Sequence, residues 1–407
     1  MSQTILGIDL GTSTVKALLI ERRMQELVVL QFVQEPVNLQ SRLSHEEQVV
    51  AILEKIFSNN ILAADVICMS LPGHLLSSRI ITLPFTNAKK ISQLIDFELE
   101  SHIPFPIEEI FSDYHVLGTS GNESQVLCTY TQDASLKKYI EGFSKAGIEA
   151  KYFGASITDL AGIAHVAMVP PEGFYIICDI GNSGTNLVIM EGKELKYVRA
   201  IGIGGYHFTR AIQRAFNLNQ EKAESLKLSR GKLYVRAQDS DQISRILNKV
   251  ALELASAIKQ TIWAFGHHHK GANIMALYCC GGGSKLVGIL DFLSFHLRFN
   301  VFELEVLNFV THQFEDPDEI NPIIPQVLAT ATRPIHSNRV PRINFRKGPY
   351  AFKQDLQMLT SELKSIGVLL LVILFLGVGY YIYADHHYAN KKAAIDKQVE
   401  LVIKDYK

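Results

Sequence analysis

The chain has 407 residues, of which 47% are apolar and 20% are charged, and its formal net charge at pH 7 is −1. This length and apolar content are sufficient for two or more domains, or for one large two-lobed domain. A net charge near zero excludes the broad electrostatic attraction behind general nucleic-acid binding, so we expect no nucleic-acid partner. The five cysteines lie in or beside apolar runs and fit no zinc spacing, which predicts buried thiols.

The N-terminal part of the chain reads mainly as strands. Residues 5–33 hold three strand-like runs separated by turn signals, and residues 66–72 form another apolar run. Two later runs on either side of Gly121-Asn122 predict a hairpin. Residues 78–155 combine this hairpin with helical patterns, and they predict a small α/β module inserted after the first sheet.

A second sheet is predicted from residue 174, where the same kind of strand phrase recurs. Residues 240–266 have the spacing of a long helix, and residues 274–297 read as strand, glycine turn and helix. Beyond Asp316 the chain is punctuated by prolines, with room for one more helix in "PIIPQVLATATR". Residues 333–364 are predicted to form a linker.

Residues 365–384 contain no charged side chain. About 20 residues at a rise of ~1.5 Å each span about 30 Å, the thickness of the hydrocarbon core of a bilayer. The stretch is apolar all round rather than on one face, which favours a single transmembrane helix over a buried core helix. Three tyrosines gather at one end, as in an interfacial aromatic belt: Tyr380, Tyr381 and Tyr383.

The orientation of this helix rests on other features, because basic residues flank it almost equally on both sides. The first residues are short and polar before they reach Asp9, so they do not read as a signal peptide. We therefore expect a cytoplasmic N-terminal domain, with residues 385–407 as a short helical stub outside the cytoplasm.

The phrase "GIDLGTSTVKALLI" at residues 7–20 places polar residues where a buried strand ends. Gly11 permits a tight turn and close approach of the backbone to a ligand. Thr12 and Ser13 supply amide groups and hydroxyls of the kind that bind anions in turns. Asp9 could hold a hydrated Mg²⁺ beside a phosphate, and Lys16 could add a positive charge.

A matching phrase, "ICDIGNSGTNLVIM", occurs at residues 177–190. One Asp-x-Gly turn between strands is common. Two copies, each between buried strands, predict two hairpins that clamp a polyphosphate between two lobes. In the second hairpin Asp179 would hold Mg²⁺ through water, and the phosphate-binding residues would be Gly181, Ser183, Gly184 and Thr185.

A run of three glycines provides a third element. Gly281, Gly282 and Gly283 join a strand to a helix, so the backbone could lie flat against an adenosine, with Ser284 nearby. The alternative is an ordinary strand–helix turn. Together with the two hairpins, this turn predicts ATP and Mg²⁺ as ligands that the site could take.

These elements resemble the actin-like ATPase superfamily, which includes sugar kinases, Hsp70, FtsA and the pilus protein PilM. The resemblance implies that residues 1–332 form two lobes, each with a sheet of the ribonuclease H type, and that ATP–Mg²⁺ lies in the cleft. Residues 78–155 resemble the inserted subdomain of FtsA and PilM. The resemblance to PilM implies that Glu224 and Lys227 face the adenine and ribose. A surface ion pair at i,i+3 is the alternative for these two residues.

Catalytic residues are not evident, because the pattern places no Gln or Glu to orient a hydrolytic water. Asp159 in "SITDLAGIAHV" is a weak candidate, and a helix cap is its alternative role. We therefore expect that the protein is not an enzyme, and that any ATP hydrolysis is slow.

The segment "PRINFRKGPYAFKQDLQ" before the apolar stretch resembles the "INLL" phrase of PilN, which docks on PilM. It also resembles the "NLLQG" phrase of GspL, the type II secretion protein L, which is organised like PilM and PilN joined in one chain. This resemblance implies that Ile343, Asn344 and Phe345 dock into a groove of the chain's own actin-like domain. Phe345-Arg346 departs from the usual Leu-Leu. A basic linker attracted to anionic lipid is the alternative.

The combined resemblance implies an inner-membrane platform component of a bacterial type II secretion system that recruits a hexameric secretion ATPase. A component of type IV pilus assembly resembling PilM and PilN, or a membrane-tethered actin-like ATPase, is the alternative. The expected partners are the ATPase, GspM- or PilO-like platform proteins, the membrane and further copies of this chain. GspL continues into a periplasmic domain, whereas this sequence stops after the stub.

Overall fold

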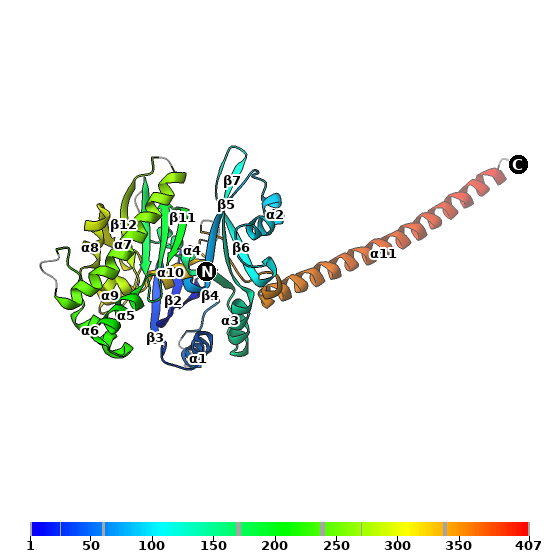
Figure 1. The fold of residues 1–407 in the computed structure, drawn as a ribbon. Helices are drawn as coiled ribbons and strands as arrows, with labels where there is room; N and C mark the ends of the chain where they lie inside the picture. The colour runs from blue at the N-terminus through cyan, green and yellow to red at the C-terminus, as the bar shows by residue number, and fades with distance from the viewer. Residues whose placement is uncertain are drawn as a thin grey trace. The chain divides into compact units, whose positions relative to one another are not determined.

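The computed structural model divides the chain into two compact units, Met1–Tyr350 and Ala351–Lys407 (Figure 1). The two units are described separately. The structure describes residues 2–24, 26–58, 62–167, 172–236, 241–269, 271–336 and 340–405.

The first unit contains two five-stranded sheets with the same strand order. In each sheet three antiparallel strands are followed by two strands that pair in parallel. This repetition confirms the predicted mixed α/β fold with two lobes. The first sheet runs β3 (Leu27–Pro36), β2 (Thr14–Arg22), β1 (Gln3–Leu10), β4 (Val66–Leu71) and β8 (Tyr152–Ala155), and the second runs β11 (Glu194–Ile201), β10 (Thr185–Glu191), β9 (Phe174–Ile180), β12 (Ile274–Cys280) and β13 (Asn300–Glu303).

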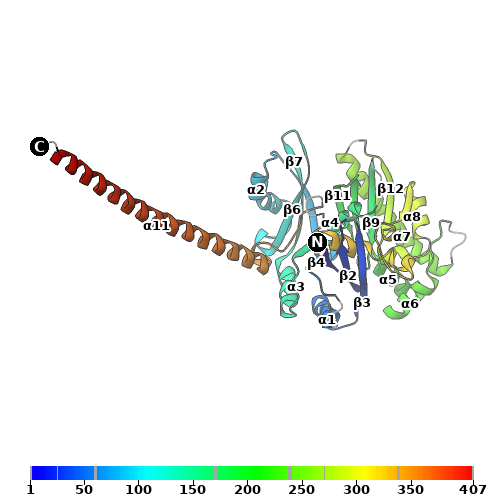
Figure 2. The same ribbon diagram turned by 180° about the vertical axis from the view of Figure 1, so that it is seen from behind.

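Helices cover both large sheets, which explains why their central strands are nearly continuous apolar runs (Figures 1 and 2). One apolar core covers both faces of the first sheet and reaches one face of the second, a second lies on the other face of the second sheet, and a third lies in residues 81–130. All five cysteines are free and buried, as predicted. The covering helices are α1 (His45–Ser58), α3 (Asp133–Lys145), α4 (Ser156–Asp159), α5 (Gly205–Phe216), α6 (Gln220–Arg230), α7 (Gln242–His268), α8 (Ile289–Leu297), α9 (Pro317–Ile320) and α10 (Pro325–Thr332).

The inserted module is built on a three-stranded sheet with the order β5-β7-β6. The predicted hairpin forms, with a two-residue turn at Gly121-Asn122. The sheet covers a shorter stretch than residues 78–155, because β8 pairs with β4 of the first large sheet and buries Phe153 there. Its elements are β5 (Ser77–Leu83), α2 (Ala88–Glu100), β6 (Ile110–Ser120) and β7 (Glu123–Gln132).

The second unit is dominated by α11 (Lys353–Asp405). Its segment Leu370–Val399 has a mean hydropathy of 1.3 and none of it is buried. Within the described part of the chain this is the one helix long and apolar enough to cross a membrane.

The segment predicted as a linker is in part packed structure. Residues 340–350 belong to the first unit, and Ile343 and Phe345 are completely buried there. Residues 337–339 of the predicted linker lie outside the described residues.

Candidate functional site

The two repeated phrases form the turns between β1 and β2 and between β9 and β10. The side chains of the two turns meet, because the amide of Asn182 donates a hydrogen bond of 3.3 Å to the hydroxyl of Thr12. A cavity of about 350 Å³ opens between the two turns. The folded chain therefore brings together two loops that are 170 residues apart in sequence.

The predicted nucleotide-binding residues line this cavity, with one exception. Ser284 is not among the lining residues, because its hydroxyl donates to the carbonyl of Gly281 at 2.7 Å and closes the local turn. Of the residues predicted to bind nucleotide, those that line the cavity are Asp9, Gly11, Thr12, Ser13, Lys16, Asp179, Gly181, Ser183, Gly184, Thr185, Glu224, Lys227, Gly281, Gly282 and Gly283.

Two carboxylates and one ammonium group form the charged floor of the cavity. Lys16 Nζ lies 2.9 Å from Asp9 Oδ2, and only 6% of Asp9 is exposed. Burial alone lowers the pKa of Lys16, but the charge and hydrogen bond of Asp9, together with Asp179, raise it above its ordinary value. Lys16 is therefore a fixed cation at the position where phosphate oxygens would enter.

These groups fit a hydrated Mg²⁺ better than a directly coordinated one. No cluster of three or more His, Cys, Asp or Glu side chains that could hold a metal occurs among the described residues. Mg²⁺ keeps several waters and binds through one or two carboxylates and substrate phosphates. Asp9 and Asp179 supply the two carboxylates, so a cation held through water beside a polyphosphate suits this donor set.

The glycine turn after β12 approaches the same carboxylates. Gly281 has a φ of +88°, and a Cβ at this position would overlap the carboxylate of Asp179 and the carbonyl of Ile180. Its amide donates to the carbonyl of Pro322 at 2.6 Å. The turn therefore forms a side-chain-free wall of the cavity, and its contact with an adenosine stays a prediction.

Glu224 and Lys227 form an ion pair of 2.9 Å at i,i+3 and also line the cavity. Both interact with the hydroxyl of Thr209, which donates to Glu224 and accepts from Lys227 at 3.0 Å. Lys227 also donates to the carbonyl of Gly205 at 3.3 Å. The i,i+3 ion pair is therefore present and both residues line the cavity, while their contact with adenine and ribose stays a prediction.

The sequence prediction missed several polar residues of the cavity, and two of them are deeply buried. Gln326 on α10 and Ser156 on α4 line it, and each is only 4% exposed. The amide nitrogen and oxygen of Gln326 and the hydroxyl of Ser156 have no hydrogen-bond partner among the described residues. Gln326 is the one amide side chain in the stretch "PQVLATAT", whose other residues are apolar or Thr, and this is the signal that could have revealed it.

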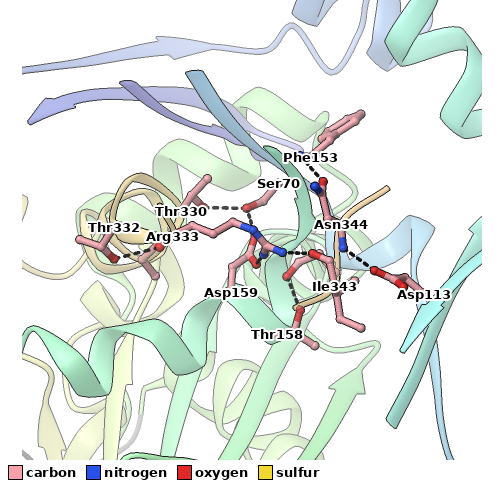
Figure 3. A network of polar contacts seen from close by, with 12 residues as sticks. Ser70, Asp113, Phe153, Thr158, Asp159, Thr330, Thr332, Arg333, Ile343 and Asn344 are labelled. Carbon is pink, nitrogen blue, oxygen red and sulfur yellow. Dashed lines mark hydrogen bonds and ion pairs between the residues drawn. The ribbon is translucent and has the colours of Figure 1, made fainter. Parts of the chain in front are cut away.

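A second candidate site is the docking segment, defined here as residues 341–350. It lies along β8, the edge strand of the first sheet. The amide of Phe345 donates to the carbonyl of Phe153 at 2.8 Å, and the amide of Phe153 donates to Asn344 Oδ1 at 3.0 Å. The amide of Asn344 donates to Asp113 Oδ2 at 2.7 Å (Figure 3). The segment thus satisfies an otherwise unpaired strand edge.

Side chains of the docking segment add apolar and charged contacts. Phe345 is completely buried and packs edge-on against Phe111, with ring centroids 6.3 Å apart. Arg346 pairs with Glu149 at 2.9 Å. Phe345-Arg346, the departure from Leu-Leu, is therefore accommodated, because the ring enters the core and the guanidinium reaches an acidic partner.

Asp159 has neither of the roles that the sequence offered for it. It is not among the residues that line the cavity, and its side chain makes no cap hydrogen bond. It is 4% exposed, pairs with Arg333 and accepts from Ser70 Oγ at 2.6 Å. Arg333 also donates to the carbonyl of Ile343, so this buried ion pair holds the docking segment (Figure 3).

The Mg²⁺-dependent affinity for ATP is expected to fall as the pH is lowered through about 6. Burial raises the pKa of Asp179 to about 6, against the charge of Lys16 and with a contribution from Asp9. The carboxyl is therefore ionised above this pH and neutral below it, where it no longer attracts the cation. Calorimetric titrations between pH 5 and 8 should give a loss of about tenfold per pH unit below 6. Asp179→Asn should reduce this dependence of affinity on pH, whereas Asp318→Asn, at an exposed position, should leave it unchanged. A wild-type affinity that does not change with pH would contradict the role assigned to Asp179.

Comparison with known proteins identifies the fold and the family of this chain. The family model of the type IV pilus assembly protein PilM matches residues 7–328. A chain of the PilM-PilN type IV pilus biogenesis complex has a TM-score of 0.69 at 22% identity, covering 81% of this chain and 98% of that chain. This match confirms the actin-like fold.

Two further solved structures are more distant. The cytoplasmic domain of EpsL, an inner membrane component of the type II secretion system of Vibrio cholerae, has a TM-score of 0.42 at 9% identity, covering 85% of this chain and 99% of that chain. MreB 5 of Spiroplasma citri bound to AMPPNP has a TM-score of 0.45 at 14% identity, covering 76% and 93%. Because the family model spans most of the chain, this protein belongs to the PilM family of type IV pilus assembly proteins.

Proposed function

We propose that this protein is a membrane-anchored adaptor of a pilus or secretion platform, in which an actin-like domain binds nucleotide and holds the start of its own membrane anchor. One observation carries the proposal. Ile343 and Phe345 are completely buried in the domain, only a few residues before the helix that contains the apolar segment Leu370–Val399. A force or movement on the anchor would therefore reach the domain through this segment.

The assignment to type IV pilus assembly is supported by the family match. The PilM–PilN complex is an assembly of two proteins. Here a segment that resembles the start of PilN lies in the same chain as the PilM-like domain. This covalent joining resembles the organisation of GspL, so a type II secretion platform is the second candidate. In both cases the domain recruits a hexameric ATPase to the inner membrane from the cytoplasmic side, and GspM- or PilO-like proteins and further copies of the chain complete the platform.

Nucleotide is proposed to act as a ligand of this adaptor rather than as a fuel. ATP would place its phosphates between the Thr12 and Ser183 turns, and Mg²⁺, when bound, would neutralise part of their charge. The cavity has the cation Lys16 and the side-chain-free wall at Gly281. Three carboxylates line the cavity among the described residues. Asp9 and Glu224 are ion-paired and Asp179 would hold the cation, so none of the three is placed as a free general base. We therefore expect slow hydrolysis of ATP.

The proposal is tested in native membranes with the full chain carrying a C-terminal affinity tag. After cross-linking in cells, the tagged chain should co-purify with a pilus or secretion ATPase and a PilO- or GspM-like protein, identified by mass spectrometry. Binding of ATP and its turnover are measured on the same purified full chain. Turnover of many ATP per second, together with the absence of platform proteins from the cross-linked material, would contradict the adaptor function.

A further inference from the structure

Two short helices each connect the cavity to the docking segment. α4 begins with Ser156 in the cavity wall and ends with Asp159 in the buried ion pair. α10 carries Gln326 in the same wall, and Arg333 follows its last turn. Each helix therefore has an unpartnered polar side chain at one end and one member of the buried ion pair at the other, and Arg333 of this pair bonds to the docking segment.

The polar groups at the cavity end make no hydrogen bond to the described residues. Both amide atoms of Gln326 and the hydroxyl of Ser156 are buried without a partner among the described residues. An unsatisfied buried amide destabilises a fold, whereas an apolar side chain of similar volume does not. These groups therefore indicate a ligand that supplies the missing hydrogen bonds.

The chemistry of that ligand follows from the neighbouring groups. The Gln326 amide nitrogen and the Ser156 hydroxyl can both donate, and the cavity that they line also contains Lys16 and the phosphate-binding turns. Donors beside a cation suit the oxygens of a phosphate group. The amide oxygen of Gln326 accepts, and it can bind a water that hydrates the same phosphate.

The far ends of the two helices are joined by a buried network. Arg333 pairs with Asp159 and also donates to the carbonyl of Ile343. Ser70 Oγ lies 2.6 Å from Asp159 Oδ2 and 2.6 Å from Thr330 Oγ1, which links α4 to α10 (Figure 3). A shift of either helix therefore changes the hold on the docking segment.

We infer that Gln326 and Ser156 form a sensor for the terminal phosphate of the nucleotide, and that α4 and α10 transmit its occupancy to the docking segment. This inference rests on the proposed binding of nucleotide in the cavity. A ligand shifts an equilibrium only by its differential affinity for the two states, and the contacts of Gln326 supply that difference. By reciprocity, the docked segment raises the affinity for ATP.

The test compares Gln326→Met with wild type on the full chain in detergent micelles. Methionine keeps the volume and removes the amide. Affinity for a non-hydrolysable ATP analogue with Mg²⁺ should fall about tenfold or more, because hydrogen bonds to a charged group are lost, while affinity for ADP should change less than about threefold. Without nucleotide the melting temperature should rise by roughly 2 °C, because an unsatisfied amide is removed. Ser156→Ala should also lower the affinity for the ATP analogue. Gln260→Met, at an exposed position on α7, should change neither this affinity nor the melting temperature.

Hydrogen exchange reports the transmission. In wild type the ATP analogue should slow exchange at the amides of Asn344 and Phe345 about fivefold or more relative to ADP. In Gln326→Met a saturating analogue should leave their exchange as in ADP. The inference is overturned if wild type and Gln326→Met bind the analogue equally well. It is also overturned if the exchange rates of these amides in wild type are the same with the analogue and with ADP; in both cases nucleotide binding itself stands. If wild type binds no nucleotide, the proposed nucleotide function itself fails.

Discussion

Arg333→Met is expected to lower the free energy of unfolding of the Met1–Tyr350 unit by about 3–5 kcal/mol. The substitution leaves the carboxylate of Asp159 buried without its cation, and it removes the donor to the carbonyl of Ile343. The side chains of Arg333 and Asp159 are only 5% and 1% exposed, so water cannot replace the lost partner. Urea titration of the full chain in detergent, followed by circular dichroism, measures the loss.

Two further variants distinguish the loss of the ion pair from a general packing defect as the cause of the lower stability. Asp159→Leu combined with Arg333→Met replaces both charges by apolar groups and should recover most of the lost stability. Lys285→Met breaks the exposed pair with Glu319 and should cost less than about 1 kcal/mol. An Arg333→Met variant within 1 kcal/mol of wild type, or a double variant no more stable than the single one, would show that the pair does not have this role.

The two lobes could be predicted because their signal is local. Each phosphate-binding turn follows a buried strand directly, so "DLGTSTVK" and "DIGNSGTN" report a strand end, a turn and a second strand without knowledge of the rest of the fold. The duplication then implies two similar sheets. The side chains of the two phosphate-binding turns are positioned by the turns themselves. Their meeting in one cavity could therefore be predicted once the two lobes were assumed to face each other.

Ser284 was misplaced for a related reason. A hydroxyl next to three glycines suits a ligand contact, but a serine three residues after a free carbonyl also closes its own turn. In the structure the local bond to Gly281 at 2.7 Å prevails. Residue type and position within a turn do not distinguish these two outcomes.

The sensor and the ion pair could not be predicted, because they depend on contacts between distant segments. Asp159 and Arg333 are 174 residues apart in sequence. Each alone reads as a helix-end charge, and only the packing of α10 beside α4 makes them partners. Similarly, prolines predict irregular backbone after Asp316. Prolines alone do not show that residues 341–350 are packed against β8, and only the resemblance to PilN and GspL implied that this segment docks on the domain.

Phe345→Ala is expected to release the docking segment from the domain. The ring is completely buried, and removing a buried Phe side chain costs about 3–5 kcal/mol. The remaining contacts of the segment include the pair of Lys347 with Asp113 at 2.7 Å, in which the lysine side chain is 44% exposed and which adds little. We therefore expect local opening of this segment to become about 150- to 5000-fold more frequent, while the two sheets remain folded.

Limited trypsin digestion of the full chain in nanodiscs measures this opening. Cleavage after Arg346 or Lys347 separates the actin-like domain from the apolar helix, and the released domain is recovered in the supernatant. Wild type should be cut slowly, since these residues are held by Glu149 and Asp113. Phe97→Ala removes a ring that is 73% exposed and should digest as wild type does. Equal rates of release from wild type and Phe345→Ala would mean that the buried ring is not what holds the anchor to the domain, and that the charged contacts of Arg346 and Lys347 are sufficient.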